Sequence, residues 1–145
     1  MWTPMSVRIV RPDAFDPGTA QTNGSQRLAA VTRSGGIETG LWGGLFSMEP
    51  GATIDVHHHG VQETIAYVLE GVSHLRWGQH GEFSGVARAG DFLHIPAWLP
   101  HMETNRSLDT PVRWVVVRST PEPIVVNLPK SIWDNPDDAA SDQSR

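Results

Sequence analysis

Four histidines in this chain have the residue type and spacing that a metal site requires. His57, His58 and His59 are consecutive and follow a Pro-Gly turn at residues 50–51, and His101 comes 42 residues after His59, behind a second turn that contains proline. Neutral imidazole is the commonest protein ligand of transition metals. Because side chains alternate between the two faces of a strand, we expect His57 and His59 on one face and His58 on the other.

Two imidazoles from one strand and a third from another leave coordination positions open for water or substrate, as in catalytic metal sites. We therefore predict His57, His59 and His101 as metal ligands, with His58 turned away from the ion. His94 interrupts an apolar strand. It is either a fourth imidazole or proton-transfer group of the site, or an ordinary hydrogen-bonded histidine.

Short hydrophobic segments must position these side chains. The chain contains 14 Gly and 11 Pro, and no segment longer than ten residues keeps a helical period. Turn residues every 8–12 positions predict an all-β sandwich or barrel with little helix. The predicted strands are 7–10, 28–32, 41–48, 53–59, 64–69, 73–77, 92–95, 101–104, 113–118 and 124–127.

Composition excludes several classes of protein. The 145 residues suit one domain, predicted over 1–129 and followed by an acidic, flexible tail over 130–145. The absence of cysteine excludes disulfides and thiolate zinc sites. The formal net charge is −5 without a basic stripe, which argues against nucleic acid as a partner. No apolar segment is long enough for a membrane span and no signal peptide is evident, so we expect a cytoplasmic protein.

Two segments resemble the motifs of the cupin superfamily. The first begins at Gly51, contains the His-x-His pair after five intervening residues, and ends at Gly71. The second runs from Gly90 through Pro96-x-Trp98 and His101 to Asn105 and matches every spacing, with Trp98 in place of the usual glycine. The resemblance implies a jelly-roll double-stranded β-helix with one divalent transition metal per chain.

The first motif departs from the family at its acidic ligand. Counted back from Gly71, the glutamate position of the family falls on Thr64, and Glu63 lies one residue early. A β-bulge would turn Glu63 inward and restore a three-His-one-Glu site. A regular strand would instead present Gln62, in phase with Thr64, as a neutral ligand. We favour Gln62 because it requires no bulge.

Aromatic residues predict an apolar pocket above the metal. Six tryptophans are many for this length, and several share a strand face with other large apolar residues. Such a group could line a barrel cavity suited to a large, flat, apolar ligand. The predicted pocket residues are Trp42, Phe46, Tyr67, Trp77, Trp98 and Trp114.

Among cupins, the string HHHGVQE looks most similar to the small single-domain cyclases of bacterial aromatic polyketide (antibiotic) pathways, of the resistomycin type. That resemblance implies a zinc ion that polarises a carbonyl group of a poly-β-ketone for aldol-type ring closure. Metal-bound hydroxide, a spare histidine or Glu63 would act as the base, and we predict Glu63 and His94 as catalytic residues.

Two alternatives stay open. A quercetinase-like dioxygenase would place Fe, Mn, Ni or Cu in the same ligands and act on a phenolic substrate. A non-catalytic cupin would only bind a small molecule. In each case we expect a homodimer, formed through the apolar edge segments 7–10 and 123–128.

Overall fold

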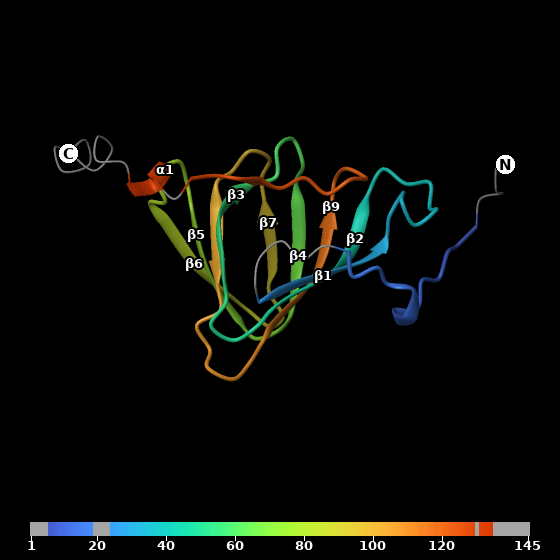
Figure 1. Ribbon diagram of the computed structural model, residues 1–145, viewed down its shortest axis with the longest axis horizontal. Coiled ribbons are helices and arrows are strands. Elements are labelled where there is room, and N and C mark those ends of the chain that lie inside the picture. The colour runs from blue at the N-terminus through green and yellow to red at the C-terminus, as the bar shows by residue number, and fades with distance from the viewer. Residues whose placement is uncertain (1–5, 19–23, 130, 135–145) are drawn as a thin grey trace.

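The computed structural model describes residues 6–18, 24–129 and 131–134, and its regular structure is almost entirely β (Figure 1). Two short helical turns, η1 (Pro12–Ala14) and α1 (Ser131–Asp134), lie towards the two ends of the chain. Neither is long or apolar enough to cross a membrane. The strands are β1 (Ser25–Val31), β2 (Trp42–Met48), β3 (Thr53–His58), β4 (Thr64–Glu70), β5 (Val72–Trp77), β6 (Phe83–Arg88), β7 (Phe92–Ile95), β8 (His101–Thr104), β9 (Val112–Arg118) and β10 (Val126–Asn127).

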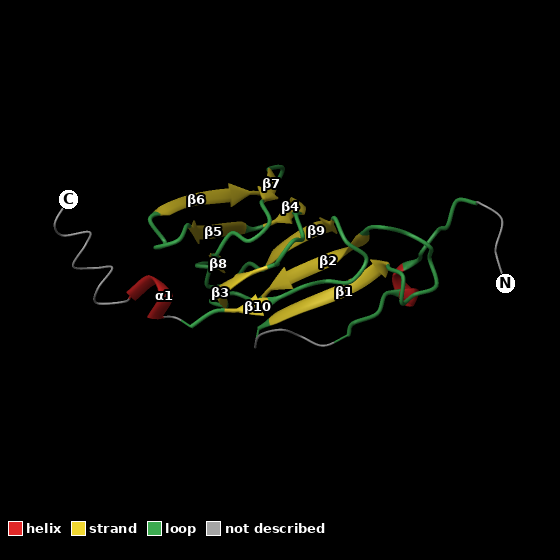
Figure 2. Ribbon diagram, turned by 90° about the horizontal axis from the view of Figure 1, so that it is seen from above, coloured by secondary structure: helices red, strands yellow, loops and turns green. Residues whose placement is uncertain are grey.

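The strands form two five-stranded antiparallel sheets. The first, sheet A, has the order β1-β2-β9-β4-β7, and the second, sheet B, has the order β10-β3-β8-β5-β6. Figure 2 shows the sheets from above, with β6, β5 and β7 at one side and β1 at the other. From β2 to β10 the chain crosses between the sheets at every step except from β5 to β6, which are neighbours in sheet B, and this alternation confirms the predicted double-stranded β-helix.

Strict alternation of buried and exposed side chains builds the core between the sheets. Every second residue of β2 and of β9 is buried, because these two strands pair along their full length near the middle of sheet A. Burying each large side chain of this kind contributes about 1.5–3 kcal/mol. The main core cluster consists of Trp42, Phe46, Met48, Ile54, Ala66, Val112, Trp114 and Val116.

Two of the strand predictions were wrong. Residues 7–10 form no strand, and Val7 and Ile9 are 85% and 73% exposed. Their apolar alternation has no neighbouring strand to pair with in the described part of the chain. The missed strand is β6, which reads Phe-Ser-Gly-Val-Ala-Arg. As the edge of sheet B it buries only Ala87, so its sequence carries little apolar alternation.

The segment predicted as a flexible tail is partly folded. Within 130–145, the structure describes residues 131–134, where helix α1 packs against the barrel. Trp133 is buried, and its indole N–H donates to the carbonyl of Gly78 at 3.0 Å. The guanidinium of Arg76 lies over the Trp133 ring at 4.7 Å. The folded unit therefore extends beyond residue 129.

Candidate metal centre

Three buried histidines meet on sheet B. His57 lies on β3, His59 follows directly after it, and His101 opens β8 as the register partner of His57. One ring nitrogen from each lies within 4.8 Å of the others. An irregularity in the β3–β8 ladder between Ile54 and His57 shifts the phase of β3, so that Val56 and His57 are both buried. This shift turns His57 towards the interior.

Backbone carbonyls fix how each ring presents its nitrogens. The Nδ1 atoms of His57 and His101 lie 2.7 Å from the Asp55 carbonyl and 2.9 Å from the Leu99 carbonyl. With Nδ1 donating, Nε2 carries a lone pair that can bind a metal. The Nε2 atom of His101 is buried, and within the described residues no hydrogen bond satisfies it. Three neutral imidazoles, one of them with a buried nitrogen that has no hydrogen bond, fit a divalent transition ion.

Burial keeps the three rings neutral, which is the form that binds a metal. Desolvation lowers the pKa of His57, lowers that of His59 to about 2 and lowers that of His101 to about 3. The cation of Arg118 adds to the effect at all three rings. Protons therefore do not compete with a metal at neutral pH.

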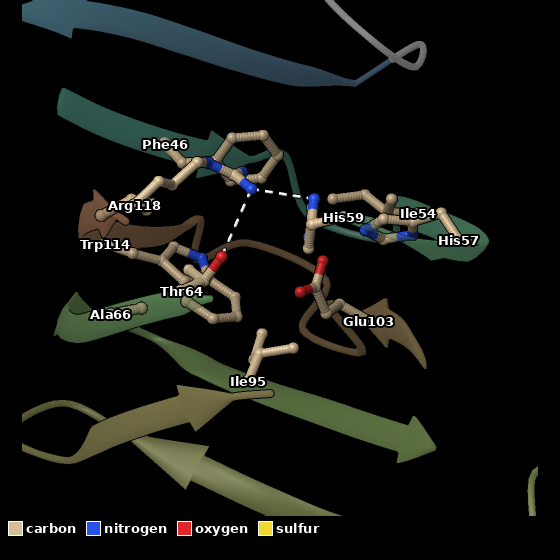
Figure 3. A pocket seen from close by; sticks show the side chains of 11 residues that line it. Phe46, Ile54, His57, His59, Thr64, Ala66, Ile95, Glu103, Trp114 and Arg118 are labelled. Atoms are coloured by element: carbon tan, nitrogen blue, oxygen red, sulfur yellow. Dashed lines mark hydrogen bonds between the residues drawn. The ribbon is translucent and has the colours of Figure 1, made fainter. Parts of the chain in front are cut away.

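Arg118 is the buried cation beside this cluster (Figure 3). Its Nη1 atom lies 2.9 Å from Nδ1 of His59 and 3.4 Å from the hydroxyl oxygen of Thr64. The same His59 nitrogen lies 2.7 Å from the carbonyl oxygen of Ile124. Only the tautomer that donates to Ile124 leaves Nε2 of His59 available for a metal. Metal binding therefore selects the Ile124 hydrogen bond over the one from Arg118.

Gln62 points inward, as the regular-strand interpretation requires, but its carboxamide is already engaged. The amide nitrogen donates to the Thr120 hydroxyl at 2.6 Å and to the Glu122 carbonyl at 2.9 Å. The amide oxygen accepts from the backbone N–H of Ile124 at 3.1 Å. Gln62 thus ties the 120–124 loop to the start of β4. Serving as the fourth ligand would require these hydrogen bonds to break.

The two predicted catalytic residues are outside the pocket around His57 and His59. Nε2 of His94 lies 2.9 Å from Oε1 of Glu63, and both side chains are 57% exposed. Glu63 lies just before β4 and faces solvent, so no bulge turns it inward. Glu63 lines neither of the two cavities that adjoin the histidines, whereas His94 lines the larger one together with His101. A proton-transfer role of His94 stays a prediction.

A buried acid that the sequence analysis overlooked does face the histidines. Glu103 lies two residues after His101 on β8, and its Oε1 atom is 3.8 Å from Nε2 of His101. Burial raises the pKa of the Glu103 carboxyl to about 7, against the opposing effect of Arg118. The signal was present in the sequence, because residues i and i+2 of a strand share a face.

Two cavities adjoin the cluster. A small one, about 30 Å³, lies among His57, His59, Glu103, Arg118 and the inner face of sheet A, with room for about two water molecules. A larger one, about 360 Å³, has His101 among its lining residues and is mainly apolar. The larger cavity is lined by Leu75, Trp77, Gly85, Val86, Leu93, His94, Ile95, Pro96, Leu99 and His101.

The predicted aromatic pocket is therefore divided. Phe46 and Trp114 line the small cavity and Trp77 lines the large one. The other three line neither. Trp42 is buried with its ring 5.8 Å from the Arg118 guanidinium, Tyr67 packs on Phe92, and Trp98 is 58% exposed beside His58.

Comparison with known families agrees with this geometry. Residues 44–118, which include all three histidines, match the family model described as "Cupin domain". The chain belongs to the cupin family. A comparison with curated protein sequences gives no significant match.

Solved structures of other cupin-like proteins share the fold. An oxalate oxidase in complex with glycolate is 25% identical, with a TM-score of 0.63 over 77% of this chain and 59% of that one. An uncharacterised double-stranded β-helix protein from Klebsiella pneumoniae is 16% identical, with a TM-score of 0.62 over 83% and 96%. Bacillus subtilis oxalate decarboxylase, with Mn(II) centres, is 19% identical, with a TM-score of 0.63 over 74% and 29%. The chain thus spans about three fifths of the oxidase and less than a third of the decarboxylase.

Two departures from the cupin motifs now have a structural description. At the glutamate position of the family, Thr64 is buried and its hydroxyl accepts from Arg118 instead of facing the metal as a carboxylate. At the usual glycine, Trp98 has φ +66°, in the left-handed region that disfavours a large side chain. Its backbone N–H donates to the Gly60 carbonyl at 2.8 Å, which holds the two motifs together.

Proposed function

We propose that this cupin is a metal-dependent enzyme in which His57, His59 and His101 hold one divalent ion, with zinc as the expected metal. The bound ion would supply Lewis acidity to a carbonyl oxygen of an apolar polyketone or phenolic substrate. The reaction that we propose is the intramolecular, aldol-type ring closure of a polyketide. The observation that carries the proposal is the apolar cavity that has His101 in its lining, because the buried Nε2 atom of His101 has no hydrogen-bond partner among the described residues.

The protein's own residues have three tasks in such a reaction. The walls of the larger cavity, among them Leu75, Trp77 and Leu93, would bind the apolar substrate and keep water out. Holding a flexible chain with its reacting carbons close together can contribute roughly 7–11 kcal/mol towards the barrier. The Arg118 guanidinium, buried and still cationic with a pKa of about 10, borders the small cavity beside the histidines and would stabilise negative charge that develops on an oxygen bound at the ion.

Oxygenase chemistry on a phenolic substrate is a second candidate, and the Glu103 carboxylate favours it. A carboxylate beside the ion supports higher oxidation states better than neutral ligands alone. Similarity to an oxalate oxidase supports the same candidate at the level of the fold. The two candidates use the same cavity and differ in the metal and in the need for O₂.

Metal analysis tests the site, and product analysis tests the reaction. The protein, purified without a metal column, should retain about one equivalent of metal by mass spectrometry. His57→Ala and His101→Ala should lose it, whereas His58→Ala, whose side chain packs on Trp98, should keep it. Unchanged metal content in both of the first two variants would refute the site.

For the reaction, the loaded protein should convert a poly-β-ketone into a cyclised aromatic product without consuming O₂. Stoichiometric O₂ uptake with flavonols or catechols would show that the protein is an oxygenase and not a cyclase. Metal retention without turnover of either substrate class would contradict both enzymatic candidates.

A further inference from the structure

The carboxylate that the first cupin motif lacks is present on another strand. Thr64 occupies the motif position on β4, in sheet A, and its hydroxyl lies against Arg118. Glu103 instead comes from β8, in sheet B, the sheet that also positions the three histidines. The two strands face each other across the small cavity. The motif position on β4 therefore has no carboxylate, whereas β8 has one on the opposite side of the cavity.

Glu103 has the surroundings of a ligand rather than of a structural acid. Its side chain is buried, it borders the same small cavity as His57 and His59, and in Figure 3 its carboxylate points into that cavity. Its contact with Nε2 of His101, at 3.8 Å, is too long for a hydrogen bond. Neighbours across the ladders are the apolar Ile54 on β3 and Leu75 on β5. Within the described part of the chain the Glu103 carboxyl has no hydrogen bond, and a buried carboxylate in that state is costly unless a cation binds it.

The imidazole of His101, beside Glu103, also has a nitrogen without a hydrogen bond among the described residues. Nε2 of His101 is buried without a hydrogen-bond partner among the described residues, and it lies 3.8 Å from Oε1 of Glu103. An ion bound to this nitrogen would therefore lie next to Oε1 of Glu103. Glu103 lies outside the group of three clustered nitrogens, so its side chain, which has three rotatable bonds, must turn towards His57 and His59 to share their ion.

We propose that Glu103 is the fourth protein ligand of the metal, so that all four donors come from β3 and β8 of sheet B and its continuation at His59. The carboxylate replaces the β4 glutamate of the cupin motif, and Arg118 with Thr64 takes the space which that glutamate would use. The centre then carries a net charge of +1 before substrate binds. It also accepts a harder ion, such as Mn²⁺, more readily than three imidazoles alone.

This inference rests on the proposed metal site but not on the proposed reaction, and metal binding to the full-length protein tests it. Apoprotein, prepared with a chelator, is titrated with Mn²⁺ by EPR and with Co²⁺ by visible absorption. Glu103→Gln, which keeps the shape of the side chain, should raise the Kd for Mn²⁺ roughly tenfold or more. It should also alter the Co²⁺ ligand-field spectrum. Glu103→Asp retains a carboxylate on a shorter stem and should give an intermediate Kd.

The matched control is Glu63→Gln, which removes an exposed carboxylate on the other side of β4 and should leave both titrations unchanged. Zn²⁺ affinity of Glu103→Gln should fall less than Mn²⁺ affinity, a difference that a merely structural role of Glu103 would not produce. Equal Kd values and identical Co²⁺ spectra for wild type and Glu103→Gln would overturn this inference alone. Absence of metal binding by the wild type would overturn the proposed function as well.

Discussion

Each histidine of the centre uses one nitrogen to orient its ring and leaves the other for a ligand. His57 and His101 bind carbonyls only two residues before them, so their orientation is set within one strand end. His59 binds the carbonyl of Ile124, 65 residues later, so its orientation depends on the 120–124 loop. Gln62 fastens that same loop through its carboxamide. We therefore interpret Gln62 as the residue that positions the acceptor of His59.

At this scale, the buried Glu103 carboxyl predicts the pH dependence of apoprotein stability. Its pKa is about 7 in the folded protein and 4.5 when exposed. As the pH rises from 4.5 to 7, the unfolded chain releases this proton before the folded chain does. Stability is therefore lost over that window, by about 3 kcal/mol at 1.36 kcal/mol per unit.

Metal-free Glu103→Gln should accordingly be more stable than metal-free wild type at pH 8, relative to the difference between them at pH 4. Urea unfolding of both apoproteins at the two pH values measures this change. An identical difference at both pH values would show that Glu103 ionises normally.

The elements around the centre owe their positions to a few irregular points. The phase shift in β3 brings His57 to the inner face, and the turn at Trp98 delivers His101 to the start of β8. Trp98 is the one non-glycine residue with positive φ among the described residues. Strain of this kind persists where the surrounding contacts determine the backbone.

Trp98→Gly should relieve this strain. We expect the Gly variant to be more stable than the matched Trp98→Ala variant by about 1 kcal/mol, because both lose the ring and only alanine keeps the left-handed penalty. Thermal or urea unfolding of the pair provides the measurement. Equal stability of the two variants would mean that the turn relaxes out of the left-handed region.

Helix α1 provides a second test at the scale of elements. Trp133→Ala should destabilise the protein by about 3 kcal/mol, because it removes a buried ring and leaves the Gly78 carbonyl with only the longer hydrogen bond, of 3.4 Å, from the Gly81 N–H. Metal stoichiometry should not change, since Trp133 lines neither cavity. Ile132→Ala, at a half-buried neighbour, serves as the control and should cost less. Equal stability of Trp133→Ala and wild type would show that α1 does not hold the barrel.

For the molecule as a whole, the outer face of sheet A carries exposed apolar side chains in register. Ile65 pairs with Val117, and Tyr67 pairs with both Val115 and Phe92. Phe92 is 73% exposed and Ile65 is 49% exposed. Contiguous patches of this kind mark interaction surfaces. The homodimer expected from the sequence therefore finds a better candidate here than in segment 7–10, which forms no strand.

A dimer through this face predicts that light scattering will give twice the monomer mass at high concentration. Ile65→Lys with Phe92→Lys should shift the protein to the monomer, whereas Val7→Lys with Ile9→Lys should not. Wild type that remains monomeric at every concentration tested would contradict the prediction.

The sequence predicted the barrel and the three histidines because both depend on local rules, namely turn spacing and strand alternation. It placed Gln62 inside correctly, but the loop that satisfies its carboxamide has no pattern that a sequence reveals. Strand β6 was not predicted, because an edge strand needs little alternation of apolar and polar residues. Glu103 was not predicted although its spacing from His101 equals that of His57 from His59, because it lies on the second motif and the acid of the cupin pattern belongs to the first.

The histidines lie on sheet B, whereas sheet A lines the cavity beside them, and this separation affects how the sequence of such a protein can change. In the small cavity, sheet A contributes walls such as Phe46, Ala66 and Val116, and none of the three clustered histidines. Substitutions there can reshape the space above the ion without removing an imidazole. Conservative substitutions at these three core positions should therefore change the water-sized space beside the ion while all three imidazoles stay in place. The surroundings of the ion and its histidine ligands can then change independently during evolution.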